Sequence, residues 1–302
     1  MVDEVLAALV PRAGGRYVDG TVGGGSHAAA ILAASVPDGW LLGCDRDAWA
    51  IEAAGERLTA AGFAGRFEFR HGNYFEMAEW VPPGSCDGVL LDLGVSSPQL
   101  DEAERGFSFQ RDGPLDMRMD PREPVTAADV VNGWSESDLV GVFREFGDEP
   151  RARLIARTIV QERARRPLVS TGQLAALVER VSPRAGRARH PATRVFQALR
   201  MVVNDESRSL QSGLAAACTV LKGGGRLAVI TFHSYEDRLV KAFGREHCRD
   251  YEFDGPVDVP ELRRPRQPLL RWVQRRAVQP AEAELESNPR ARSAQLRILE
   301  KI

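Results

Sequence analysis

Short apolar runs alternate with helix-like segments along the first hundred residues. Runs typical of buried strands lie at residues 16–20, 40–45, 67–74 and 86–92. Helical segments follow a first short helix at 6–10: one starts near Ser26, a plausible N-cap, and one spans 47–61. Apolar strands separated by helices are typical of a parallel sheet buried on both faces. The pattern predicts an α/β fold with a Rossmann-like, mostly parallel sheet.

The alternation stops after the fourth strand and resumes about a hundred residues later. From residue 105 to residue 207 the sequence has helical stretches but no long apolar strand. The simplest topology is one α/β core interrupted by an inserted helical domain. We therefore expect a core formed by residues 1–104 and 208–302, and an inserted domain formed by residues 105–207.

The last hundred residues complete the predicted core. A helix at 208–221 leads through a glycine-rich turn at 222–226 into the most apolar strand, 227–232. Two later strands, at 269–275 and 293–299, are spaced to pair with each other. They predict an antiparallel edge on the otherwise parallel sheet.

Composition restricts the class of protein. The chain has 302 residues, of which 43% are hydrophobic, enough for a packed core. No apolar run approaches the roughly 18–20 residues that span a bilayer, and the N-terminus lacks the basic region of a signal peptide. We expect a soluble cytoplasmic protein with no membrane partner. The four cysteines form no CxxC pair, so we expect neither a metal site nor disulfides; they are Cys44, Cys86, Cys218 and Cys248. No feature of the sequence fixes an oligomeric state.

Positive charge is concentrated in the predicted insertion. Residues 151–200 hold twelve arginines and two acids, Glu162 and Glu179, so this stretch carries net +10 and the remainder net −12. A second run, 263–276, has six arginines and no acid. Segregated positive charge is typical of a protein with a polyanionic partner such as nucleic acid. For any single arginine, an ordinary solvated face is the alternative.

Arginines near the end of the insertion are candidates for phosphate contacts. Arg194 and Arg200 share a broad helical face, and Arg184, Arg187 and Arg189 precede them. Near the end of the chain, Arg290 and Arg292 form a second candidate group, either for RNA contact or for closing the cleft.

A glycine turn follows the first strand and points to a nucleotide-like cofactor. Gly23 and Gly25, with Ala28, satisfy the GxGxxA pattern of dinucleotide sites. Asp45, at the end of the second strand, suits the hydroxyls of a ribose. Asp19 precedes the glycines, and an acid there is common in S-adenosylmethionine enzymes. The glycine pattern alone leaves NAD and S-adenosylmethionine open.

The carboxylates favour S-adenosylmethionine. Asp19, Asp45 and Asp92 each end a predicted strand, and the carboxyl ends of parallel strands meet at one edge of the sheet. A sulfonium with a free amino group attracts carboxylates, whereas a pyrophosphate is repelled by them. We expect the three acids to surround the positively charged part of the cofactor.

The fourth strand ends in an unusual turn, DLGVSSPQL. Methyltransferases that act on amino groups of bases often place a Pro-containing turn here, where carbonyl and side-chain acceptors hold the NH2 group. The turn Ser96-Ser97-Pro98-Gln99 resembles such a turn, although it lacks the second Pro and the aromatic residue. A capped loop that enters the insertion is the alternative.

Four blocks of sequence resemble the MraW/RsmH family of small-subunit ribosomal RNA methyltransferases. They are LLDLGVSSPQLDEAERGFSFQRDGPLDMRMD (90–120), HPATRVFQALRMVVNDE (190–206), ITFHSYEDRLVK (230–241) and SNPRARSAQLRI (287–298). The resemblance implies a class I S-adenosylmethionine-dependent methyltransferase with an inserted helical substrate domain. It also implies methylation of N4 of a cytidine in the decoding region of 16S ribosomal RNA, within the small ribosomal subunit.

The resemblance also implies roles for individual residues. The cofactor positions are Gly25, Ser26, His27, Asp45, Tyr74, Asp92 and Gln99. The family often has glycine where Ser26 stands, and it usually has a His-x-Pro-Val segment where this sequence has only Met1 to Asp3 before Glu4-Val5. Independently of the resemblance, the residue types suggest Ser97, Asp92 and His233 as candidate catalytic residues, and Arg194, Arg200, Arg290 and Arg292 as candidate RNA contacts.

Two other functions and one structural reading stay open at this point. The GxGxxA turn also fits an NAD-dependent oxidoreductase, against which the basic insertion argues. A non-catalytic RNA-binding factor is a third reading, against which Asp45 and Asp92 argue. For His233, a structural histidine bonded to Glu236 or Asp237 is the alternative to a catalytic role.

Overall fold

The computed structural model describes residues 1–183, 190–254 and 256–302 and divides into two compact units. The core unit contains residues 1–94 and 208–302, and the helical unit contains residues 95–207. The helical unit begins at Val95, earlier than the expected residue 105, because Val95 and Leu100 pack against its hydrophobic core.

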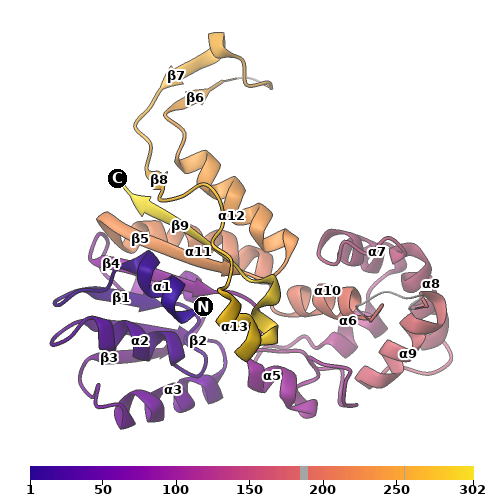
Figure 1. Cartoon of the computed structure of the whole chain (residues 1–302). Helices are drawn as coiled ribbons and strands as arrows, with labels where there is room; N and C mark the ends of the chain where they lie inside the picture. The colour runs from indigo at the N-terminus through magenta and orange to yellow at the C-terminus, as the bar shows by residue number, and fades with distance from the viewer. Residues whose placement is uncertain (184–189, 255) are drawn as a thin grey trace. The chain divides into compact units, whose positions relative to one another are not determined.

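The core unit is built on a mostly parallel sheet (Figure 1). Within the described residues it has seven strands in the order β3-β2-β1-β4-β5-β9-β8. The strands are β1 (Arg16–Asp19), β2 (Trp40–Asp45), β3 (Phe67–His71), β4 (Cys86–Asp92), β5 (Leu221–Thr231), β8 (Leu270–Trp272) and β9 (Gln295–Lys301). Strands β1 to β5 pair in parallel, whereas β9 is antiparallel to both β5 and β8. The predicted Rossmann-like α/β class, with its antiparallel edge, is confirmed.

Helices cover both faces of this sheet. Side chains alternate between the two faces along a strand, so Tyr17 and Leu90 pack with one set of helices and Val18 and Leu91 pack with the other. The first face carries α1 (Val2–Leu9), α2 (Ser26–Ala34) and α3 (Ala48–Ala60). The second face carries η1 (Tyr74–Glu76), α4 (Met77–Trp80), α11 (Glu206–Val220) and α12 (Ser234–His247). The sheet is therefore buried on both sides, as the continuous apolar strands predicted.

One predicted helix start and one predicted N-cap are wrong, whereas the predicted start of the second helix near Ser26 is confirmed. The first helix begins at Val2 rather than at residue 6. Ser26 is the first residue of α2, and Gly25 is its N-cap, with φ of +76°. A left-handed backbone is strained for serine and accessible to glycine, so the cap falls on the glycine. The Ser26 hydroxyl instead accepts a hydrogen bond from Arg57, at 3.2 Å.

The glycine-rich segment before the most apolar strand lies within β5. Leu221 pairs with Cys86 and Arg226 pairs with Gly88, so the residues between Leu221 and Arg226 bulge out of the ladder. Gly224 has φ of +79° in this bulge. The predicted turn at 222–226 thus interrupts the strand, which starts at Leu221 instead of residue 227.

The remaining elements of the core unit are short. The two-stranded ribbon of β6 and β7 extends beyond the main sheet in Figure 1. The elements are β6 (Tyr251–Phe253), η3 (Pro260–Leu262), β7 (Arg263–Pro265), α13 (Glu282–Ser287) and η4 (Pro289–Ser293). Among the described residues, no helix has the length and apolar character required to cross a membrane.

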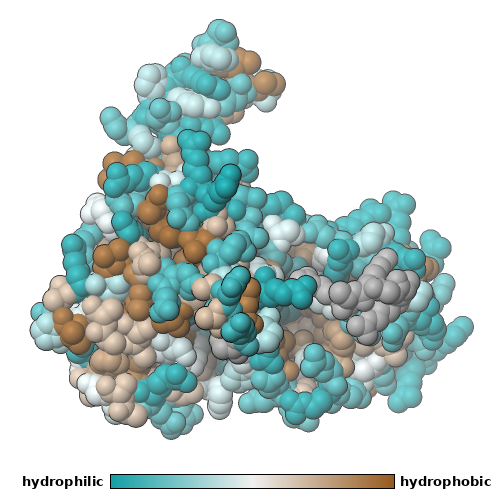
Figure 2. Space-filling model, viewed as in Figure 1, coloured by the Kyte–Doolittle hydropathy of each residue, from teal (hydrophilic) through white to brown (hydrophobic). Residues whose placement is uncertain are grey.

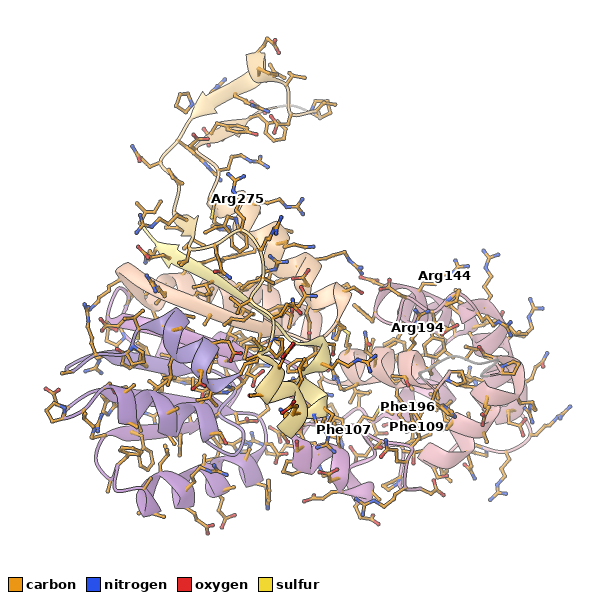
Figure 3. All side chains as sticks on the ribbon, in the orientation of Figure 1. Phe107, Phe109, Arg144, Arg194, Phe196 and Arg275 are labelled. Carbon is orange, nitrogen blue, oxygen red and sulfur yellow. The ribbon has the colours of Figure 1, made fainter. Side chains whose placement is uncertain are left out.

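The helical unit has its own hydrophobic core. Phe143, Ile155, Leu174 and Leu199 are fully buried in it. Phe109 meets Phe196 edge to face, with 4.8 Å between ring centroids (Figure 3). Its elements are α5 (Ser97–Asp101), η2 (Ala103–Arg105), α6 (Ala127–Gly133), α7 (Glu136–Glu145), α8 (Ala152–Arg163), α9 (Thr171–Val181) and α10 (Thr193–Val203). An independent core agrees with a separate folding unit.

Candidate cofactor site

Three carboxylates meet at the carboxyl edge of the sheet. Asp19 ends β1, which lies between β2 and β4 and pairs with both. Asp19 is in register with Gly43 and Leu90, so Asp45 and Asp92 each lie two residues further along the neighbouring strands. The sequence therefore predicted this gathering of acids correctly.

Asp45 holds the glycine turn in place. One carboxylate oxygen accepts the Gly23 N–H at 2.9 Å, and the other accepts the Asp47 N–H at 3.0 Å. Burial raises the pKa of Asp45, although hydrogen bonds from backbone N–H groups act in the opposite direction. Asp45 thus connects the end of β2 to the turn after β1, so a ligand at this carboxylate would also touch the glycine loop.

Asp19 is a buried carboxyl group with incomplete hydrogen bonding. Its side chain accepts the Thr21 N–H at 3.2 Å through Oδ1, and Oδ2 has no hydrogen-bond partner among the described residues. Burial, opposed by the hydrogen bond from Thr21 and reinforced by the nearby Asp92 and Asp45, raises the pKa of Asp19 to about 7. This carboxyl group can therefore change its protonation state near neutral pH.

Asp92 faces the side chain of His27. The distance from His27 Nδ1 to Asp92 Oδ2 is 3.5 Å. The Asp92 N–H donates to the Thr21 hydroxyl at 2.6 Å, which joins the ends of β4 and β1. Burial lowers the pKa of His27 and raises that of Asp92, so both side chains are pushed towards their neutral forms. The sequence analysis placed His27 among the cofactor positions but did not predict this side-chain contact.

Thr21 is a residue that the sequence reasoning missed. Its N–H donates to Asp19 and its hydroxyl accepts from Asp92, so one residue contacts two of the three strand-end acids. A threonine two residues after a strand-end aspartate was the available signal, since such hydroxyls and N–H groups often cap nearby acids.

The unpartnered atoms at this edge fit a cationic ligand. Asp19 Oδ2, His27 Nε2 and Asp92 Oδ1 are buried and have no hydrogen-bond partner among the described residues. A buried polar atom without a partner costs about 1–3 kcal/mol, so a ligand that binds these atoms recovers that free energy. S-adenosylmethionine presents an ammonium and a sulfonium group to such acceptors. A pyrophosphate would place negative charge against them, which argues against the dinucleotide alternative.

The glycine turn leaves little room for side chains beside Gly25. A Cβ atom on Gly25 would lie 3.1 Å from the Ala54 Cα and Cβ atoms, whereas a Cβ atom on Gly24 would meet nothing within 4 Å. Gly25 lets the start of α2 approach α3 closely. The first N–H groups of α2, including those of Ser26 and His27, remain available to a ligand at the helix N-terminus.

Tyr74 packs in the core beside the site. It is 9% exposed, and its ring lies against Gly213 of α11, where an added Cβ would come within 2.3 Å of Cε2. The neighbouring Asn73 caps η1 and donates to the Ser209 hydroxyl at 2.9 Å. Protein covers most of the surface of this ring, and the cofactor role of Tyr74 stays a prediction.

The turn after β4 forms the start of α5 in the helical unit. Ser96 is the N-cap: its hydroxyl accepts the Gln99 N–H at 3.4 Å, and Gln99 Oε1 accepts the Ser96 N–H at 3.0 Å. This capping box is the capped-loop alternative considered for the sequence. Gln99 is 5% exposed, whereas Ser97, the first residue of the helix, is exposed. The cofactor role of Gln99 and the catalytic role of Ser97 stay predictions.

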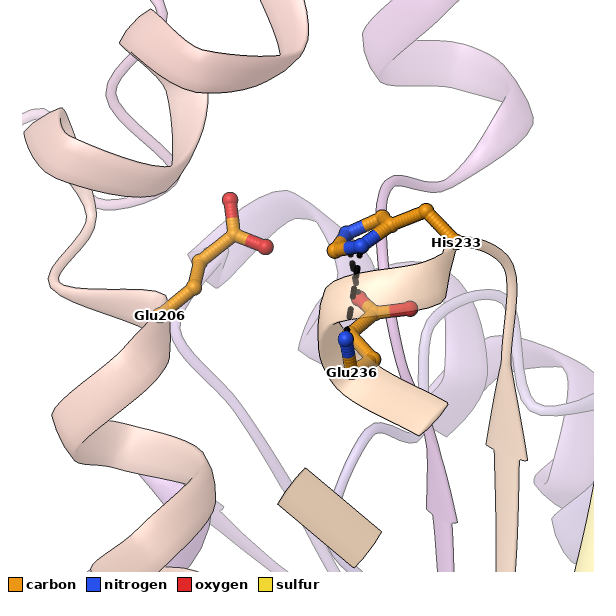
Figure 4. A group of neighbouring side chains, drawn as sticks. All are labelled: Glu206, His233 and Glu236. Carbon is orange, nitrogen blue, oxygen red and sulfur yellow. Dashed lines mark hydrogen bonds and ion pairs between the residues drawn. The ribbon is translucent and has the colours of Figure 1, made fainter. Parts of the chain in front are cut away.

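His233 makes the contacts of a structural histidine. It is the N-cap of α12, its Nε2 lies 3.0 Å from Glu236 Oε1, and its Nδ1 accepts the Glu236 N–H at 3.5 Å (Figure 4). Glu236 is 3% exposed and also accepts the Phe232 N–H, at 2.8 Å. These bonds agree with the structural alternative, and a catalytic role for His233 stays a prediction.

The candidate RNA arginines differ in their surroundings. Arg194 (Figure 3) is exposed and donates to the Asp148 carbonyl at 2.9 Å. Arg200 is 13% exposed and makes a two-pronged ion pair with Glu206, at 2.7 and 2.8 Å. Glu206 balances the mostly buried charge of Arg200, and a contact of Arg200 with phosphate stays a prediction.

The other candidate arginines lie elsewhere in the chain. Arg290 and Arg292 are exposed on η4 of the core unit. Arg184, Arg187 and Arg189 lie outside the described residues.

Known proteins resemble the chain over its whole length. The sequence pattern of the MraW methylase family matches residues 1–302. A ribosomal RNA small subunit methyltransferase H from Syntrophotalea carbinolica is 49% identical and covers 100% of the chain and 96% of its own length. The enzyme of that name from Symbiobacterium thermophilum is 47% identical, with coverages of 100% and 95%. A solved rRNA methylase from Streptococcus thermophilus is 12% identical, with a TM-score of 0.43 and coverages of 99% and 94%.

Proposed function

The chain belongs to the MraW methylase family, and on that premise we propose that it transfers a methyl group from S-adenosylmethionine to N4 of a cytidine in the decoding region of 16S ribosomal RNA. The observation that carries the proposal is the gathering of Asp19, Asp45 and Asp92 at one edge of the sheet. The basic helical unit supports the RNA part of the proposal, since residues 151–200 carry net +10. We further propose that the protein binds this RNA within the small ribosomal subunit, in the cytoplasm.

The proposed reaction requires alignment more than strong base catalysis. S-adenosylmethionine, when bound, supplies an electrophilic methyl group on a positively charged sulfur. Cytosine N4 is a weak nucleophile because its lone pair is delocalised into the ring, so the protein must hold the amine in line with that methyl group. Carboxylates at the site stabilise positive charge near the reacting atoms.

Individual residues have proposed parts in this alignment. Gly25, His27 and Asp45 would hold the cofactor through the glycine turn and the end of β2. Ser97, through its hydroxyl and carbonyl, would accept hydrogen bonds from the amine. The amine loses a proton after methyl transfer, to water or to a nearby acceptor, for which Asp92 and His233 are candidates.

Methyl transfer to isolated small subunits tests the proposal. Subunits that lack methylation at the target would be incubated with the protein and radiolabelled S-adenosylmethionine, and the RNA would be digested to nucleosides. We expect label in N4-methylcytidine. Label in another nucleoside, or no transfer from a protein that binds the cofactor, would overturn the assigned substrate.

A binding measurement separates the proposal from the dinucleotide alternative. Calorimetry with S-adenosylmethionine and with NADH should detect binding of the first only. The variant Asp45→Ala should bind S-adenosylmethionine at least tenfold more weakly, because it removes the acceptor that holds the Gly23 N–H. Glu56→Gln, an exposed change on α3, is the matched control.

A further inference from the structure

We propose that the solvent-facing ridge of α8 in the helical unit is a docking surface for the RNA backbone. This α8 ridge consists of Arg153, Arg157 and Gln161, followed by Arg165 in the turn after the helix, and all four side chains are exposed. The proposal deepens the proposed function and rests on it, since it names the surface through which the substrate RNA is held.

Helical spacing places these side chains in one row. Residues four apart lie on the same face of an α-helix, about 6 Å apart along its axis. The Arg165 N–H bonds to the Glu162 carbonyl at 2.9 Å, so the chain continues to turn beyond Arg163. The opposite face of the helix carries Ile155, Ala156 and Ile159, which are fully buried. The α8 ridge thus presents positive charge along about 18 Å of surface.

Among the described residues, one of the three ridge arginines has an acidic partner. Arg157 lies 3.7 Å from Glu136 of α7, a contact between two largely exposed side chains. Glu162, the acid of α8, pairs with Arg180 of α9 at 3.1 Å instead. No ion pair or hydrogen bond of the Arg153 or Arg165 side chain is found among the described residues. Figure 2 shows hydrophilic residues predominating over α7 and α8 in this view.

Stability does not explain this arrangement. Like charges four residues apart, such as Arg153 and Arg157, destabilise a helix. Arg153 lies in the first turn of α8, where the helix dipole disfavours a cation and where the helix has no acid. Ordinary solvated faces mix charges of both signs, because opposite charges at this spacing support the helix. A ridge that lowers the stability of its own helix points to a polyanion that offsets the repulsion.

RNA backbone is the partner that this chemistry fits. A nucleic-acid duplex presents about one negative charge per 1.7 Å, so a row of guanidinium groups can contact several phosphates. Guanidinium groups also match phosphate oxygens in geometry. The ridge carries no aromatic side chain, so it provides affinity and orientation rather than recognition of particular bases.

The salt dependence of RNA binding tests the α8 ridge. The variant Arg153→Gln/Arg157→Gln/Arg165→Gln keeps good helix formers and removes three charges. Binding of the full-length protein to deproteinised small-subunit RNA, and to intact subunits, would be measured from 50 to 200 mM salt. The salt slope is the decrease in log affinity per unit increase in log salt concentration, and each lost phosphate contact reduces it by about 0.7–0.9. Loss of three contacts means that raising salt from 50 to 200 mM should weaken binding of the variant by a factor roughly 20- to 40-fold smaller than the factor for the wild type. Thermal unfolding should show a variant at least as stable as the wild type.

A charge-matched control makes the result specific. Arg12→Gln/Arg16→Gln/Arg70→Gln removes three exposed charges from the core unit and should keep the wild-type slope. An equal slope for the α8 variant and the wild type, or equal reductions in both triple variants, would overturn the inference. If the α8 variant binds intact subunits more weakly but binds deproteinised RNA as the wild type does, the ridge contacts a protein partner, and the inference is also overturned. If the wild type methylates no cytidine, the proposed function fails instead, whatever the slopes show.

Discussion

The His27 imidazole and the Asp92 carboxylate lie against each other, with 3.5 Å between Nδ1 and Oδ2, where β4 ends and α2 begins. Each also has a second buried polar atom without a partner among the described residues. The pair is therefore arranged for a ligand that completes its hydrogen bonds, and the neighbouring Asp19 shares this property.

Cofactor affinity should depend on pH through Asp19. Its pKa of about 7 means that the carboxyl group is mostly protonated below pH 7 in the free protein. A cationic ligand favours the carboxylate and lowers this pKa, so binding releases a proton below about pH 7. We expect the affinity for S-adenosylmethionine to rise from pH 6 to pH 7.5 and then to level off. Calorimetry in two buffers of different ionisation enthalpy measures the released proton.

Asp19→Asn is the control for this pH dependence. The variant should bind more weakly and show a flatter profile between pH 6 and pH 7.5, because the titrating carboxyl group is gone. A profile in Asp19→Asn as steep as that of the wild type would assign the titration to another group, with Asp92, His27 and Asp45 as the nearest candidates.

Two neighbouring glycines should respond differently to alanine. Gly25→Ala forces a left-handed backbone on alanine and brings its Cβ to 3.1 Å from Ala54, so we expect a loss of roughly 1–2 kcal/mol in unfolding free energy. Gly24→Ala meets nothing within 4 Å and should change stability little. Urea unfolding of both variants measures the difference. Equal losses would show that the conformation of Gly25 does not matter.

Ser97→Ala should affect catalysis rather than cofactor binding. Ser97 is exposed at the start of α5, and the cap is supplied by Ser96, so the helix should keep its stability. We expect a lower single-turnover rate of methyl transfer with nearly unchanged affinity for S-adenosylmethionine. Equal rates for variant and wild type would remove Ser97 from the proposed alignment of the amine.

The ion pair between Arg297 and Asp237 should be important for stability. Arg297 Nε lies 2.5 Å from Asp237 Oδ1, the two side chains are 9% and 11% exposed, and the pair connects β9 to α12. Removing one partner leaves a buried charge without compensation, which costs about 3–5 kcal/mol. Arg297→Met should therefore lower the urea midpoint strongly.

A double variant tests whether the loss of stability in Arg297→Met comes from the uncompensated charge of Asp237. Arg297→Met/Asp237→Leu should recover part of the stability lost in the single variant, because neither charge then remains buried alone. Lys241, which lies 3.0 Å from Asp237, limits the loss in the single variant. No recovery in the double variant would assign the loss to packing.

Features that depend on local periodicity were predictable from the sequence. The strands ending in Asp19, Asp45 and Asp92 were placed correctly, because each is an apolar run with a polar residue at its end. Their meeting at one edge follows from parallel pairing. Resemblance to a known family, rather than periodicity, supplied the function of this edge.

Features that depend on particular side-chain partners were not predictable. The spacing of Arg194 and Arg200 placed both on one face, but only tertiary structure shows that Glu206 binds Arg200. The side-chain contact between His27 and Asp92 joins residues 65 positions apart in the chain, which no local pattern reveals. The N-cap of α2 was assigned to Ser26 rather than Gly25, because the left-handed backbone that decides it is not visible in the sequence pattern.

The discontinuity of the core unit has a consequence for biosynthesis. Residues 95–207 are contiguous, whereas the sheet needs β5, β8 and β9 from residues made after them. During translation the helical unit can acquire its tertiary structure before β5, β8 and β9, which complete the sheet, have been synthesised. The strands that carry the three aspartates are made before the helical unit, yet β4 keeps an unpaired apolar edge until β5 has been synthesised, and such an edge is prone to pair with other chains.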